Sequence, residues 1–268
     1  MDVLDVMVSM KFERTHPGPF RFHAHGSPVP AEELESIVPG LCVVREELCF
    51  LQAGVWMSAL ELVEYGYELC GCYEVCPWRF SDEITERERS LSRAGLATYV
   101  KACSGLRGSR LASKSLVRVR DGAKSPMEAA TAMLVVMPRK DGGLGYRGVE
   151  LNRRVPVPEA LRCLTRSSEL EVDIYSAKER AGVEYDGEDH AEAAQRARDA
   201  ERLAVLAAMD IRVNVVTKGQ FLSQLSLNRA MNVVARNLGV APDFSPEFQR
   251  AQNDLRKFLI RGWASNSR

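Results

Sequence analysis

The feature that most constrains the fold of this chain is the order of elements predicted for its second half. Ser125-Pro-Met-Glu128 is a capping-box pattern with proline at the first helical position, which predicts a helix that stops at Pro138. Three strand-type segments follow, then an alanine-rich helical segment, a fourth strand and further helical sequence. The order helix, three strands, helix, strand favours a mixed central sheet flanked by helices. We therefore expect an α/β (α+β) fold.

The first half is predicted to be mainly helical. Apolar residues recur at helical spacing from Glu46 to Leu69, which predicts one long helix there. Shorter helices are expected near residues 91–102 and 109–119, a strand at Leu41–Val44, and a loop over the proline-containing segment 23–30. We divide the chain into an N-terminal region, residues 1–122, and a second domain, residues 123–268.

In the second domain, strands are predicted from their apolar and β-branched content and helices from their periodicity. The predicted strands are 149–155, 170–175, 181–185 and 211–216, and the predicted helices are 129–137, 191–209, 219–238 and 246–259.

Bulk composition restricts the functional classes only weakly. Thirty-six basic residues balance thirty-six acidic ones, so attraction to phosphate depends on local patches. No apolar run reaches the length of a bilayer span, and the N-terminus carries Asp2 and Asp5 where a signal peptide has a basic head. We expect no membrane partner, a cytoplasmic location and seven cysteines that stay reduced.

Three acidic residues lie on or directly after two adjacent predicted strands that a short polar turn connects. Asp173 is on the first strand, Glu184 is on the second, and Asp186 directly follows the second in the run Gly182-Val-Glu-Tyr-Asp-Gly. Side chains alternate along a strand, so Glu184 and Asp186 share a face, and hairpin pairing can place Asp173 beside them. Carboxylates held close together repel unless a cation or a proton compensates them. Magnesium binds through one or two carboxylates, and a bound metal activates water for phosphodiester hydrolysis. The pattern therefore predicts a site for Mg2+ or Mn2+.

At these residues the sequence resembles the PD-(D/E)XK nuclease superfamily, specifically its very-short-patch-repair-endonuclease-like branch. The likeness covers roughly residues 125–221, a little over a third of the chain. It consists of the helix residue Glu128, then Asp173 before the hairpin, and then a Glu-x-Asp-Gly motif followed by histidine, at Glu184, Asp186 and His190.

The resemblance implies a restriction-endonuclease-like fold and a metal-dependent endonuclease that acts on DNA. It assigns Asp173, Glu184 and Glu128 as metal ligands. Asp186 would assist catalysis, and His190 would orient water or phosphate. It also implies a bacterial protein, and a homodimer is an open alternative because many nucleases that cut two strands pair their sites.

One departure from the family pattern bears on catalysis. The usual lysine, two positions after the glutamate, is here Asp186, so another residue such as His190 or Lys218 would have to supply the cation. A second hypothesis is therefore a nuclease fold that has lost catalysis and acts as a nucleic-acid-binding or antitoxin-like regulatory module. A third is that the N-terminal region binds a protein partner.

Several of these residues also have simpler structural explanations. The capping box alone accounts for Glu128, and His190 could start the following helix. Asp199 and Arg202, three positions apart, form either an intrahelical pair or a brace for the site.

A basic stripe precedes the second domain. Arg107, Arg110, Lys114 and Arg118 are spaced by three, four and four positions, which places them on one face of a predicted helix. Such a stripe either follows a nucleic-acid backbone, with counterion release driving binding, or is an ordinary solvated face.

Overall fold

The computed structural model describes residues 4–8, 20–24, 29–39, 41–75, 84–187 and 193–262, with the backbone alone for 4–8, 20–24, 41, 84 and 193–197. Within these residues the strands of the first half are β1 Leu4–Val8, β2 Phe20–Ala24, β3 Leu34–Val38, β4 Leu41–Val44, β5 Tyr73–Val75 and β6 Ile84–Glu86. Its helices are η2 Ala31–Glu33, α1 Glu46–Ala53, α2 Ala59–Leu69, α3 Arg93–Ala102 and α4 Ser109–Leu116. Beyond residue 124 the helices are α5 Pro126–Val136, η3 Arg139–Asp141, η4 Glu159–Leu164, α6 Ala193–Ala208, α7 Lys218–Leu222, α8 Gln224–Asn237 and α9 Pro246–Leu259. The strands there are β7 Glu150–Pro156, β8 Glu169–Ser176, β9 Ala181–Asp186 and β10 Arg212–Thr217.

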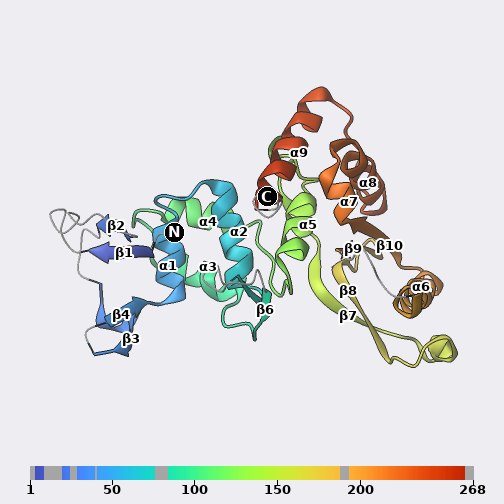
Figure 1. Cartoon of the computed structure of the whole chain (residues 1–268), viewed down its shortest axis with the longest axis horizontal. Helices are drawn as coiled ribbons and strands as arrows, with labels where there is room; N and C mark the ends of the chain where they lie inside the picture. Colours follow the sequence, from blue (N-terminus) through green and yellow to red (C-terminus); the bar gives the residue numbers. More distant parts are fainter. Residues whose placement is uncertain are drawn as a thin grey trace.

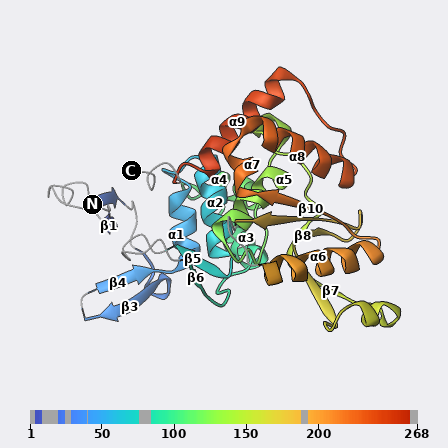
Figure 2. The ribbon, with the colours of Figure 1, turned by 45° about the vertical axis from the view of Figure 1, so that its right-hand side comes forward.

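The central sheet is mixed and has the strand order β10-β9-β8-β7. β7, β8 and β9 pair antiparallel, whereas β10 pairs parallel with β9 after the crossover through α6. The helices of the first half and α5 lie on one side of this sheet, α7 to α9 lie beyond its β10 edge, and α6 runs alongside it (Figures 1 and 2). The predicted mixed sheet flanked by helices is therefore confirmed.

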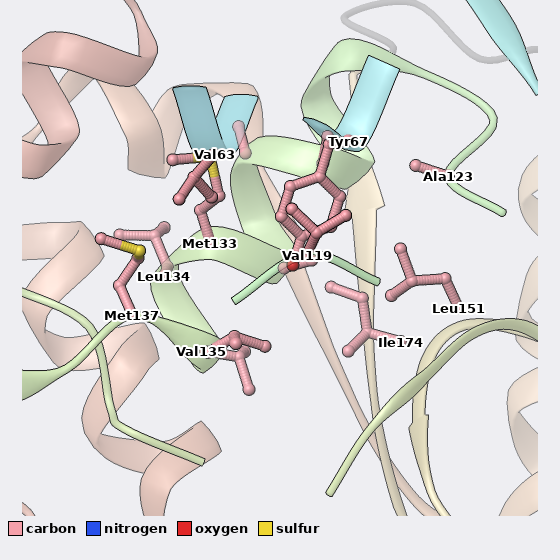
Figure 3. Close-up of a cluster of buried hydrophobic side chains, with 14 of the residues drawn as sticks. Val63, Tyr67, Val119, Ala123, Met133, Leu134, Val135, Met137, Leu151 and Ile174 are labelled. Carbon is pink, nitrogen blue, oxygen red and sulfur yellow. The ribbon is translucent and has the colours of Figure 1, made fainter. Parts of the chain in front are cut away.

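Two hydrophobic clusters stabilise this arrangement. The larger joins α1 to α5, one part of the sheet and α7 to α9, so it contains buried residues from both halves of the chain. Figure 3 shows its centre, where Val63 and Tyr67 of α2 meet Met133 of α5 and Leu151 and Ile174 of the sheet. The smaller cluster packs α6 against the sheet through residues that include Val172 and Leu206. Continuous apolar packing therefore links the sheet to the N-terminal helices.

The prediction of one long helix from Glu46 to Leu69 is wrong. α1 ends at Ala53, and Ser58 begins α2 with a capping box in which its hydroxyl accepts from the amide of Glu61 and its amide donates to the Glu61 carboxylate. Gly54, which follows α1, has no room for a side chain, because a Cβ there would lie 2.7 Å from the carbonyl oxygen of Gly108. The hydrophobic periodicity continues across the break, which is why it indicated a single helix.

Other boundaries differ less. The helix predicted at 219–238 is divided into α7 and α8 at Ser223, whose side chain caps α8. The loop predicted at 23–30 contains the end of β2, and residues 25–28 lie outside the described residues. Among the helices of the described ranges, none combines the length and apolar composition that a bilayer span requires.

Candidate functional site

Asp173 lies at the point where the β8–β9 ladder ends. The last registered pair on this side is Ile174 with Val183, so the next pair would set Asp173 opposite Glu184. In place of that pair, Oδ2 of Asp173 accepts a hydrogen bond of 3.0 Å from the backbone amide of Tyr185. The half-buried carboxyl is therefore fixed between the diverging strands.

The electrostatic environment of Asp173 reveals the other acids around it. Burial raises the pKa of Asp173 to about 7, while the hydrogen bond from the Tyr185 amide opposes the shift. The carboxylates of Glu128 and Glu184 raise this pKa further, and the guanidinium of Arg202 lowers it. Two of the other predicted residues, Glu128 and Glu184, therefore lie close enough to Asp173 to disfavour its charged form. Near neutral pH the Asp173 carboxyl is therefore partly protonated, chiefly because it is buried.

Glu184 is the most buried of the three acids, with 5% of its surface exposed. Arg202 of α6 binds its carboxylate in a bidentate ion pair, with Nη1 to Oε1 at 2.6 Å and Nη2 to Oε2. Nη1 of Arg202 also donates to the carbonyl oxygen of Glu171 on β8, at 3.0 Å. The ion pair with Glu184 raises the pKa of Arg202. Arg202 therefore compensates the charge of Glu184 and braces the site. Of the two alternatives given for Asp199 and Arg202, this contact corresponds to the brace.

Glu128 is held at the N-terminus of α5. Its amide donates to Oγ of Ser125 as the capping-box pattern predicts, but its carboxylate accepts from the amide of Lys124 at 2.9 Å. The same oxygen, Oε2, accepts from Nδ2 of Asn152 on β7 at 2.7 Å. Glu128 therefore has a structural role, since it connects the start of α5 to β7 of the sheet.

Asn152 is a residue that the sequence analysis missed. It lies on β7 between the registered pairs of Leu151 with Ile174 and Arg153 with Val172, which places it opposite Asp173. Its φ of 48° is left-handed, a conformation that asparagine tolerates better than most residues. An asparagine within an otherwise strand-forming run was the available signal, because asparagine is depleted in strands.

The remaining predicted site residues are placed less centrally. Asp186 is exposed at the end of β9, opposite Thr217 in the parallel register with β10. His190 lies outside the described residues. Lys218, one of the two alternatives for the missing cation, begins α7, a helix that the capping box of Thr217 and Gln220 opens.

A metal ion fits this donor set only in part. Across the described ranges, no group of three or more His, Cys, Asp or Glu side chains is arranged to hold a metal ion. Oδ1 of Asp173 accepts no hydrogen bond from a described residue, so it is available as a ligand. Both oxygens of Glu184 are bound to Arg202, and Glu128 is engaged by Lys124 and Asn152. A cation would therefore bind first at Asp173, with waters completing its coordination.

The predicted basic stripe is not one continuous helical face. Arg110 and Lys114 lie on α4 and are exposed, whereas Arg107 precedes the helix and Arg118 follows it. The guanidinium of Arg118 donates to the carbonyl oxygen of Lys114 at 3.4 Å. Only Arg110 and Lys114 therefore keep the helical spacing that suggested a phosphate-binding stripe.

Comparison with known proteins does not identify a function, so the function is inferred from the geometry of the site. No protein-family model, curated protein or solved structure matches the chain. The chemistry that the acids, Arg202 and the surrounding basic residues permit is therefore the basis of the functional assignment.

Proposed function

We propose that the chain is a metal-dependent nuclease of restriction-endonuclease-like architecture, which hydrolyses phosphodiester bonds of DNA with Mg2+ or Mn2+. The observation that carries this proposal is the grouping of Glu128 and Glu184 around Asp173. Burial is the main cause that raises the pKa of Asp173 to about 7, and the two neighbouring carboxylates raise it further. Clusters of acids with such perturbed pKa values are typical of functional sites. The resemblance of residues 125–221 to the PD-(D/E)XK nuclease superfamily also supports the proposal.

Asp173 would hold the metal, with Glu184 or Glu128 contributing a second carboxylate. A bound metal ion supplies an activated water and stabilises the charge that develops on the reacting phosphodiester. The chain itself controls the charge at the site. Asp173 must lose its proton to act as a ligand, and Arg202 must release one oxygen of Glu184 before that carboxylate can turn to a cation.

Arg202 also has a role once it is released. A guanidinium next to the carboxylates supplies positive charge and can donate two parallel hydrogen bonds to a phosphate. Arg202 is therefore a candidate for the role of the family's usual lysine, which is replaced by Asp186 here. His190, to which the resemblance assigns the orientation of water or phosphate, is another candidate.

The direct test is cleavage of single- and double-stranded DNA by the purified chain with Mg2+ or Mn2+ at pH 8. Activity should disappear in Asp173→Asn, which preserves the shape of the side chain and can still accept from the Tyr185 amide. The matched control is Asp210→Asn, since Asp210 is exposed with φ 57°, a backbone conformation that asparagine tolerates. Wild-type chain that leaves every DNA intact with both metals would contradict the proposal.

A second candidate function has an observation in its favour. Glu184 is already neutralised by Arg202, and the described residues hold no ready group of three metal ligands. A nuclease-like fold with such a site can serve as a nucleic-acid-binding or antitoxin-like regulatory module. DNA binding that needs no divalent metal, in a chain without cleavage activity, would favour this alternative.

A further inference from the structure

A cleft of about 580 Å3 lies beside the acidic centre and takes its walls from both halves of the chain. Four arginines and two acids contribute its charged side chains: Arg89, Arg93, Arg120, Arg147, Asp121 and Glu150. Val149 and Leu151 at the start of β7 are buried and belong to the main hydrophobic cluster. Part of the cleft wall is therefore packed against the hydrophobic core.

The two acids of the cleft are engaged with other partners. Oδ1 of Asp121 accepts from the backbone amide of Arg93 at 2.6 Å, and the carboxylate of Glu150 pairs with Arg153 at 3.2 Å. Neither acid forms an ion pair with an arginine guanidinium of the cleft among the described residues.

Arg120 differs from the other three arginines. Its guanidinium donates to the carbonyl oxygens of Val117, Val119 and Arg147, which ties the segment after α4 to the start of β7. Burial and the neighbouring charges of Arg93 and Arg147 lower the pKa of Arg120, with burial the larger cause. Arg120 therefore helps to form the cleft, and its charge adds to the positive potential there.

Arg89, Arg93 and Arg147 retain their donors for a ligand. Within the described part of the chain, none of their guanidinium groups donates a hydrogen bond or forms an ion pair. Arginine presents a planar fork of donors that suits phosphate oxygens. Three such groups around one cleft indicate an anionic ligand with more than one phosphate.

The cleft and the acidic centre are adjacent along β7. Leu151 lines the cleft, and the next residue, Asn152, donates both to the carbonyl oxygen of Gly122 in the cleft wall and to Glu128. One residue of a strand advances about 3.3 Å, and one nucleotide of a B-DNA strand advances about 3.4 Å along the helix axis. A polynucleotide bound in the cleft can therefore reach Asp173 within a few nucleotides.

We propose that the cleft formed by Arg89, Arg93 and Arg147 binds the phosphate backbone of a nucleic acid next to the acidic centre. This inference rests on the proposed function, because that function supplies the polyanionic substrate. The sequence predicted phosphate contacts at the basic residues of α4. The proposed cleft lies where α3, the segment that precedes α5, and the start of β7 meet.

The experiment measures fluorescence anisotropy of labelled single- and double-stranded DNA oligonucleotides with the full chain, in EDTA and over a range of salt concentrations. The test variant is the double substitution Arg89→Ala with Arg147→Ala, because both side chains are exposed. The matched control is Arg110→Ala with Lys114→Ala on α4, which also removes two exposed positive charges. Thermal unfolding of each variant checks that the fold is retained.

We expect the cleft variant to bind DNA at least about tenfold more weakly than the wild type, since a hydrogen bond to a charged group contributes about one factor of ten or more. The slope of log affinity against log salt should fall by about 2, one for each lost phosphate contact. The α4 variant should change both quantities less.

Equal binding by the cleft variant and the wild type would overturn the inference, as would a wild-type chain that binds no DNA. The metal-free design separates this result from the proposed function. Loss of binding in the cleft variant supports the inference even if the wild type cleaves nothing with Mg2+ or Mn2+, whereas that absence of cleavage contradicts the nuclease proposal alone.

Discussion

The acidic centre and the arginine cleft adjoin at Leu151 and Asn152 of β7, and they differ in how their charges are compensated. In the acidic centre the chain supplies its own compensation, through Arg202 on Glu184 and through the amides that bind Glu128. In the cleft, Arg89 and Arg147 have no compensating acceptor among the described residues. Charges that are compensated internally stabilise the fold and must be released before they act, whereas uncompensated charges are ready for a ligand. Substitutions in the acidic centre should therefore change stability, and substitutions of the free cleft arginines should change binding.

The largest effect on stability is expected from Arg202→Ala. This change leaves Glu184 buried without its ion-pair partner, and breaking a buried pair in this way costs about 3–5 kcal/mol. Urea unfolding measures the loss, with Arg229→Ala, an exposed arginine of α8, as the control. Adding Glu184→Gln to Arg202→Ala should restore part of the stability, because it removes the unpaired buried charge. A loss of less than about 1 kcal/mol in Arg202→Ala alone would show that Glu184 does not depend on this ion pair.

The next effect is the pH dependence that Asp173 introduces. Its pKa is about 7 in the folded chain, above the ordinary value of 3.8. A raised folded-state pKa gives a stability contribution that is full below about pH 4 and is lost as the pH rises through about 7. The loss is at most about 4 kcal/mol, since each unit of pKa corresponds to about 1.4 kcal/mol.

Asp173→Asn removes this titration, so the variant should gain stability relative to the wild type as the pH is raised from 4 to 8. Urea unfolding at several pH values measures the difference, with Asp210→Asn as the matched substitution of an exposed aspartate. A constant difference between Asp173→Asn and the wild type would show that Asp173 has an ordinary pKa.

A smaller effect is expected at Asn152, which connects the two regions. Asn152→Gly keeps the left-handed backbone but removes the donor to Glu128 and Gly122, at a cost of about 1–3 kcal/mol. Asn152→Ala should cost about 1 kcal/mol more, because alanine is strained at positive φ. Equal stability of the glycine variant and the wild type would remove Asn152 as a structural link.

The smallest effect separates the arginines of the cleft. Arg147→Ala should change the free energy of unfolding by no more than about 0.5 kcal/mol, as for other exposed positions. Arg120→Ala should cost more than about 1 kcal/mol because it removes hydrogen bonds to three carbonyl oxygens. Similar losses in the two variants would contradict the distinction between a structural and a ligand-binding arginine.

The sequence predicted the parts of this structure that depend on local patterns. The strands that carry Asp173 and Glu184, the start of α5 at Ser125 and the bounds of α9 all follow from periodicity and capping residues. The grouping of Asp173 with Glu184 follows from hairpin register, which short-range sequence also encodes.

Contacts between distant segments were not predictable in the same way. The Arg202 pair with Glu184 depends on how the crossover helix α6 packs on the sheet, and the alternative intrahelical pairing with Asp199 has the same sequence pattern. The cleft combines Arg89 and Arg147, which are far apart in the chain and belong to no common motif. Helical spacing is a local signal, so it predicted a basic stripe that includes Arg110 and Lys114 but could not predict the cleft.

Calorimetric titration with Mn2+ tests the acidic centre most directly, using the wild type and Asp173→Asn at pH 6 and pH 8 in buffers of different ionisation enthalpy. The account predicts saturable binding by the wild type, with release of nearly one proton per metal at pH 6 and almost none at pH 8, because Asp173 must be deprotonated to bind. Asp173→Asn should lose this binding. A wild-type chain with no saturable heat, or a variant that binds Mn2+ as tightly as the wild type, would contradict the assignment of Asp173 as the primary metal ligand.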